Sequence, residues 1–156
     1  MRQTFQLALL VESLMAGDQI EEGLAVADEA LALVEATGER FYEAELNRLR
    51  GELLLRQNVG EDRPSAAEPA AARPHDPDPS VLAEAEACFR RALDVARSQG
   101  AKSLELRAAL SLARLLRGRG ELADGRRLLA ETFGWFTEGW DTPDLQAARE
   151  FLEESA

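Results

Sequence analysis

Residues 85–93 read AEACFRRAL, a stretch in which small and large apolar residues recur at helical spacing. Ala85, Phe89 and Ala92 are three and four residues apart, so they share one face of a helix. On such a face the small residues let a second helix approach closely, while the phenylalanine ring fills the space between them. The stretch therefore predicts the packing face of a helix in a helical hairpin, with Cys88 as a structural thiol.

The chain repeats this unit with a period of 40 residues. Two sets of equivalent positions give the register: Val11, Gly51 and Ala113 in the first helices, and Gly23, Ala85 and Gly125 in the second helices. The two positions of one unit are 12 residues apart in the outer units and 34 apart in the middle unit. The middle unit therefore carries an insertion of 22 residues. The residues predicted to pack the repeats are Gly23, Ala30, Gly51, Ala85, Phe89, Ala92, Ala113, Gly125 and Leu129.

The insertion coincides with residues 59–80, which hold five of the six prolines and the only histidine. Proline removes backbone donors and blocks helix, and the segment has too few large apolar groups to form a core. We expect a disordered loop there, with His75 as an exposed loop residue.

The composition favours an all-α protein. Alanine, leucine, glutamate and arginine dominate, whereas isoleucine and tyrosine occur once each. Apolar spacing predicts seven helices in one domain of 156 residues. Its expected parts are three antiparallel hairpins at about 3–38, 40–99 and 101–136, and a capping helix at about 142–155, with Thr142 as its capping residue and Pro143 in its first turn.

The spacing of small and large residues in these hairpins resembles the tetratricopeptide repeat, in a longer-helix form. This resemblance implies a right-handed helical array whose first helices line a concave surface. The middle first helix departs from the pattern, because Asn47 and Arg50 stand where apolar residues are usual. There Leu46, Leu49 and Leu53 are expected to pack instead.

The sequence of nearly the whole chain also resembles a narrower group of proteins. EEGLAVADEALALVEATGERFYEAELNRLRGELLL, then a proline-rich gap, then EAEACFRRALDVARSQGAKSLELRAALSLARLL and FGWFTEGWDTPDLQAAREFLEE are similar to the C-terminal repeat region of large bacterial signalling proteins. Those proteins join a class III adenylate/guanylate cyclase domain, or a DNA-binding domain, to a STAND-type ATPase. The resemblance implies a regulatory chain that carries neither the cyclase nor the ATPase part.

The net charge of −11 argues against a general nucleic-acid binder, which needs a cationic surface. One cysteine cannot form an internal disulfide, and no segment reaches the roughly 18 apolar residues of a membrane span. These features predict a cytoplasmic protein that does not bind membranes. Charge is uneven, however, because residues 82–133 carry ten basic and seven acidic groups.

No motif indicates catalysis, a metal or a cofactor. The glycines at 118, 120 and 125 do not have the spacing of a phosphate-binding loop, and the carboxylates are spread along solvated helix faces. Trp135, Phe136 and Trp140 are expected to be buried between the third unit and the last helix, opposite Phe151 and Leu152.

A binding groove is the remaining candidate site. The first helices are expected to expose Phe5, Ala8, Glu12, Met15, Glu45, Arg48, Glu52, Leu55, Arg107, Leu110, Arg114 and Arg117. The candidate residues of a peptide-binding groove among them are Glu12, Arg48, Glu52, Arg107, Arg114 and Arg117. Arg107, Arg114 and Arg117 share a helical face and could hold an acidic peptide or a carboxyl terminus through bidentate contacts. The alternative is that they pair with acidic helices nearby.

These features predict a non-catalytic domain for protein–protein interaction or regulation. Its partner would be a protein, a peptide or other domains of a parent protein, and an open end of the array would allow a homodimer. A small-molecule-sensing repeat domain of a STAND-type transcriptional regulator is the alternative, and an enzyme is the remaining rival class.

Overall fold

The computed structural model describes residues 2–60 and 78–154, and the regular structure in these two ranges is entirely helical. The predicted all-α class is confirmed. The helices are α1 (Arg2–Ala16), α2 (Ile20–Thr37), α3 (Glu43–Gly60), α4 (Pro79–Gln99), α5 (Lys102–Gly118), α6 (Leu122–Phe133) and α7 (Pro143–Glu153), with a 3-10 turn η1 (Arg40–Tyr42) before α3.

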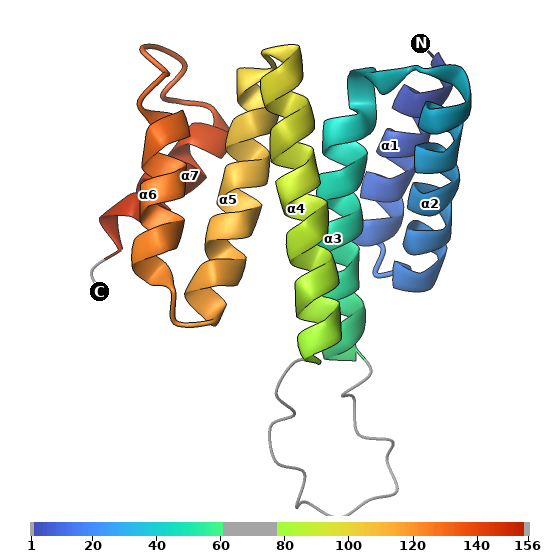
Figure 1. Cartoon of the computed structure of the whole chain (residues 1–156), viewed down its shortest axis with the longest axis horizontal. Coiled ribbons are helices and arrows are strands. Elements are labelled where there is room, and N and C mark those ends of the chain that lie inside the picture. Colours follow the sequence, from blue (N-terminus) through green and yellow to red (C-terminus); the bar gives the residue numbers. More distant parts are fainter. Residues whose placement is uncertain (1, 61–77, 155–156) are drawn as a thin grey trace, which may run out of the picture.

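Consecutive helices pack as hairpins that stand side by side. The pairs α1–α2, α3–α4 and α5–α6 contact one another, and the contacts α2–α3 and α4–α5 join one hairpin to the next (Figure 1). The helices α1, α3, α5 and α7 also touch in that order, and α7 lies against both α5 and α6. We call the surface formed by α1, α3, α5 and α7 the first-helix surface.

Close contacts between small and large residues hold the two helices of a hairpin together. A Cβ atom added to Gly51 on α3 would lie 2.6 Å from Cε1 of Phe89 on α4. In the third hairpin, a Cβ atom on Gly125 would lie 2.9 Å from the carbonyl oxygen of Ala113. All nine residues predicted to pack the repeats are buried: Gly23, Ala30, Gly51, Ala85, Phe89, Ala92, Ala113, Gly125 and Leu129.

The middle first helix packs through leucines, as the sequence predicts. Leu46, Leu49 and Leu53 are fully buried against α1 and α2. Arg50, on the same helix, is only partly exposed and takes part in an ion-pair network described below.

The helix ends differ from the predicted ones in three places. Helix α3 continues to Gly60 and α4 begins at Pro79, so the outer residues of the predicted loop 59–80 are helical. The remainder of that loop, with His75, lies outside the described residues. Thr142 precedes α7 as predicted, but its side chain makes no capping hydrogen bond.

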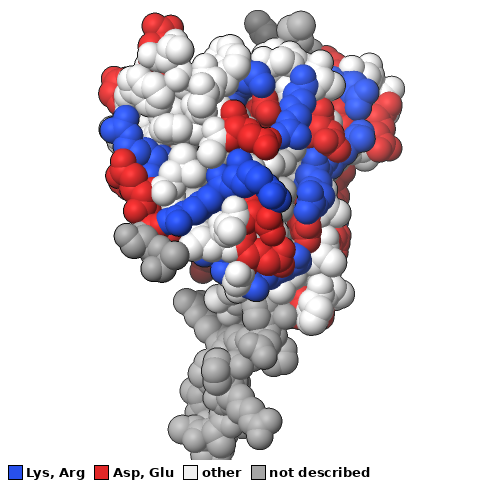
Figure 2. Space-filling model, turned by 60° about the vertical axis from the view of Figure 1, so that its left-hand side comes forward, with Lys and Arg blue, Asp and Glu red and all other residues white. Residues whose placement is uncertain are grey.

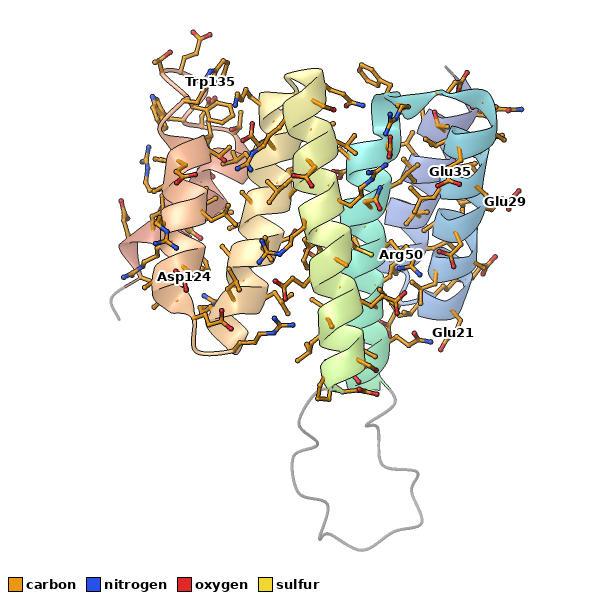
Figure 3. The ribbon with its side chains drawn as sticks, viewed as in Figure 1. Glu21, Glu29, Glu35, Arg50, Asp124 and Trp135 are labelled. Atoms are coloured by element: carbon orange, nitrogen blue, oxygen red, sulfur yellow. The ribbon has the colours of Figure 1, made fainter. Side chains whose placement is uncertain are left out.

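The predicted burial of the aromatic cluster is wrong for the two tryptophans, whereas Phe136 is partly buried against the core. Helix α6 ends at Phe133, so Trp135 and Trp140 lie on the connection to α7, where 59% and 37% of their surfaces are exposed. Trp135 stands at the end of α6 in Figure 3. Phe151 is buried in the core, whereas Leu152 packs partly against the core and lines a surface hollow together with Trp140.

None of the described helices is long and apolar enough to cross a membrane.

Candidate functional site

The six predicted groove residues all lie on the first-helix surface. Glu12 is on α1, Arg48 and Glu52 are on α3, and the remaining arginines are on α5. The structure therefore brings them onto one side of the molecule. It does not leave them equally free, because most of them already have partners in the chain.

Arg107 joins three first helices. Its guanidinium donates hydrogen bonds to Glu45 on α3 (3.0 Å) and to Asp144 on α7 (2.8 Å). Burial opposes the charge of Arg107, but the bond to Asp144 and the charges of Glu45 and Glu12 outweigh it, so the pKa of Arg107 is raised. Arg107 therefore links α5 to α3 and to α7 within the chain.

Arg48 is also occupied. Its guanidinium is 2.7 Å from Glu45 and 3.8 Å from Glu52, and only 15% of its side chain is exposed. Burial opposes its charge, yet the hydrogen bond to Glu45 raises the pKa of Arg48. Glu45, which the sequence suggests is exposed, is in fact a buried acceptor shared by two arginines. Ala8 and Leu110, predicted at exposed positions, are buried as well.

Arg117 is bound to the capping helix. Its guanidinium pairs with Glu154, just beyond the end of α7, and lies 5.2 Å from the centre of the Phe151 ring. Of the three arginines in the predicted stripe, Arg107 and Arg117 are therefore engaged by α7 and its C-terminal end, as the alternative of pairing with acidic helices expects. The sequence does not reveal this arrangement, because the partners are 37 residues away along the chain.

Arg114 is different. It is exposed, and it takes part in no hydrogen bond or ion pair with the residues that the structure describes. On the face turned forward in Figure 2, basic and acidic side chains alternate. Arg114 is thus the arginine among the predicted groove residues that forms no ion pair with a described residue, and it is available for an acidic ligand.

Arg114 stands at a cavity of about 230 Å³ between α3, α4 and α5. The lining residues are Glu52, Leu55, Leu82, Ser111, Arg114, Leu115, Gly118 and Arg119. The three leucines make an apolar floor. The polar groups at its edge are held in place, because Ser111 donates to Glu52 at 2.7 Å and Arg119 pairs with Glu86. The cavity can therefore take an apolar side chain while Arg114 binds a carboxylate next to it.

A second network of ion pairs, which the sequence does not predict, is centred on Arg50. Its guanidinium donates to Asp28 on α2 (2.6 Å), to Glu84 on α4 (2.8 Å) and to the Sγ atom of Cys88 (3.2 Å). Figure 3 shows Arg50 where these helices meet. The sequence sign of this network is Arg50 itself, which stands at a helix position where the repeat pattern usually has an apolar residue. The network joins two hairpins, and we assign it a structural role.

The Cys88 thiol shows no sign of activation. It is buried, and burial raises its pKa even though the contact with Arg50 acts in the opposite direction. In residues 2–60 and 78–154, no group of three or more histidine, cysteine, aspartate or glutamate side chains is placed to hold a metal ion.

Comparison of the chain with protein-family models, with curated proteins and with solved structures gives no match. The tetratricopeptide resemblance therefore rests on the repeated residues and on the way the described helices pack.

Proposed function

We propose that this chain is a tetratricopeptide-like, right-handed helical array that serves as a non-catalytic protein-interaction domain. Three features support the proposal: the hairpins stand side by side, the first helices adjoin, and small residues meet large ones at the predicted register. The helix α7 would then close the array, because it buries Leu145, Ala148 and Phe151. Its other face is polar and exposed, with Gln146, Arg149, Glu150 and Glu153.

The observation that carries the binding function is Arg114 beside the leucine-lined cavity. A volume of about 230 Å³ is below the roughly 300–1,000 Å³ of sites that enclose a whole small ligand. It suits one apolar side chain of a peptide. The ligand that fits is therefore a protein segment with an apolar residue next to a carboxylate.

The resemblance to cyclase–STAND ATPase proteins suggests the context. In such a protein the array would receive an input and transmit it to the ATPase and to the cyclase or DNA-binding part. The binding of a protein segment beside Arg114 would be that input, or it would be the contact that joins the array to a neighbouring domain.

One observation favours the alternative of a small-molecule sensor. A larger cavity of about 650 Å³ lies between the α2–α3 and α4–α5 connections, with Thr4, Phe41, Gln99 and Leu104 among its lining residues. Its volume suits a small metabolite. A thermal shift against a metabolite panel tests this function, and a transition that moves only with a small ligand would favour it.

Selection from a display library of random peptides tests the peptide-binding function. The wild type is expected to enrich peptides that combine an acidic residue or free carboxyl terminus with a leucine-like side chain. The Arg114→Glu variant is expected to lose these peptides, because it replaces the attractive charge by a repulsive one. The matched control is Arg127→Glu, at an arginine on α6 whose side chain is 75% exposed.

If the wild type and Arg114→Glu enrich the same peptides, the assigned site is wrong. If the wild type enriches no peptide family while a metabolite shifts its unfolding transition, the sensor function replaces the proposed one.

A further inference from the structure

Helix α1 carries no charge on the exposed side chains that the structure describes, and its partly exposed Glu12 lies beside Phe5 and Ala16 on the helix. Its exposed residues are Gln3, Phe5, Gln6, Leu9, Leu10, Ser13 and Ala16. Three of them are large and apolar, with exposed fractions of 41% for Phe5, 48% for Leu9 and 44% for Leu10. We call these seven residues the α1 face.

The α1 face contrasts with the rest of the molecule, of which 30% of the residues are charged. The next helix along the chain, α2, exposes several carboxylates, and Figure 3 shows Glu21, Glu29 and Glu35 on its outside. The cores of protein interfaces are depleted of charged residues and enriched in large apolar ones. The α1 face has this composition, so it is suited to be covered by another protein surface.

The internal repeat bears on which protein surface would cover the α1 face. The α3 residues that pack on the preceding hairpin, Leu46, Leu49 and Leu53, are fully buried. By the 40-residue register, the equivalent positions on α1 are Gln6, Leu9 and Ser13. Because two of the three leucines are replaced by polar residues, a hairpin stacked on α1 would bury less apolar surface there than α1–α2 buries on α3.

The α1 face does fit a second copy of itself. Its aromatic residue, Phe5, lies in the N-terminal half, where its half-exposed ring is 5.1 Å from the Tyr42 ring, and the small residues Ser13 and Ala16 lie in the C-terminal half. Two antiparallel α1 helices would set each phenylalanine ring against the small residues of the other copy, with Leu9 and Leu10 meeting at the twofold axis. The absence of charge also matters, because two chains of net charge −11 repel each other elsewhere.

We propose that this chain forms a twofold dimer through antiparallel packing of the α1 faces. A helix of 15 residues is about 22 Å long, so the contact is at the low end of interface sizes. A weak dimer that dissociates in the micromolar range is expected. This proposal is independent of the peptide site, which lies between α3, α4 and α5.

Sedimentation equilibrium tests the dimer between about 5 and about 500 µM protein. The average mass of the wild type is expected to rise with concentration from 17.1 kDa towards twice that value. The Leu9→Glu variant is expected to remain a monomer throughout, because it places two carboxylates at the axis. The control is Val59→Glu. Val59 is an apolar residue near the C-terminal end of α3, outside the α1 face, and is more exposed than Leu9, so this variant should dimerise like the wild type. Unchanged far-UV circular dichroism would show that each variant is folded.

Disulfide trapping tests the antiparallel arrangement. Under mild oxidation Leu9→Cys is expected to form a covalent dimer, since the two copies of this residue meet near the axis. Gln3→Cys is expected to form little, because antiparallel packing holds its two copies about 20 Å apart. The native Cys88 is buried and does not compete. The proposal is overturned if the wild type is a monomer at every concentration, if Leu9→Glu dimerises normally, or if both cysteine variants crosslink equally.

Discussion

At the scale of single residues, close packing at small side chains decides how the hairpins form. The Phe89 ring covers Gly51, and the backbone of Ala113 covers Gly125. Both glycines could be found from the sequence, because the repeat aligns them with other small residues. The buried carboxylates Glu45 and Glu105 could not be found in this way. Each looks like part of a solvated face, since its burial depends on neighbouring helices, which supply Arg107 to Glu45 and Arg97 to Glu105.

Enlarging either covered glycine should destabilise the fold. In Gly51→Ala and Gly125→Ala the new methyl group would lie within 3 Å of a fully buried ring or of backbone, so the helices must separate. Overpacking costs about 1–3 kcal/mol, which exceeds the gain of about 1 kcal/mol in helix propensity. Urea denaturation should show a net loss of up to about 2 kcal/mol in the free energy of unfolding.

The control for this experiment is Gly118→Ala. Gly118 is helical and has no other group within 4 Å of an added Cβ atom. This variant should be as stable as the wild type or more stable by about 0.5 kcal/mol. A Gly51→Ala protein at least as stable as the wild type would contradict the packing described here.

Glu105 should make stability depend on pH. Burial disfavours its ionised form, but hydrogen bonds from Lys102 and Arg97 outweigh this effect, so the pKa of Glu105 lies below its ordinary value of 4.5. A carboxylate with a lowered pKa contributes stability above the unfolded-state pKa, and that contribution is lost as the pH falls through the folded-state pKa. Stability should therefore fall on acidification below about pH 4.5.

The variant Glu105→Gln isolates this contribution. At pH 7 it should unfold more easily than the wild type by about 2 kcal/mol, because Arg97 and Lys102 lose a buried partner. The difference should shrink below about pH 4. The exposed Glu29 on α2 is the control, and Glu29→Gln should cost almost nothing at any pH. A difference between Glu105→Gln and the wild type that is independent of pH would contradict the assignment.

At the scale of helices, the sequence predicts the seven elements and their order, because apolar spacing and turn residues are local signals. It is wrong about the aromatic cluster. Gly134 is the sequence sign that α6 ends before Trp135, because glycine commonly follows the last residue of a helix, but burial of a ring depends on where the following helix docks. The pairing of Arg107 and Arg117 with the α7 region also depends on that docking.

Apolar contacts should hold α7 more strongly than its ion pairs do. Phe151 is 3% exposed, and Phe151→Ala should cost about 3 kcal/mol in the free energy of unfolding. The Arg107–Asp144 pair is exposed to solvent by 38% on each side, so Asp144→Asn should cost about 0.5 kcal/mol or less. Urea denaturation of both variants checks the ranking. A greater loss for Asp144→Asn would show that charge holds the helix.

At the scale of the whole molecule, the hairpins stand side by side, and one arginine of the predicted groove forms no ion pair with a described residue. The sequence predicts that the first helices form a common surface and that Arg114 lies on it. It does not predict the cavity beside Arg114, because leucines from three helices that are distant in the sequence make its floor. It does not predict that the other arginines are occupied either, since ion pairs between helices depend on the finished packing.

Nuclear magnetic resonance tests the central claim, that the array binds a protein segment at this cavity. The measurement is the shift of the backbone amide signals of the ¹⁵N-labelled chain on adding a peptide selected by the wild type. The largest shifts are expected at Glu52, Leu55, Ser111, Arg114 and Leu115, and they should be absent in Arg114→Glu. Shifts concentrated instead on the outer faces of α2 and α6, or unchanged in the variant, would contradict the account.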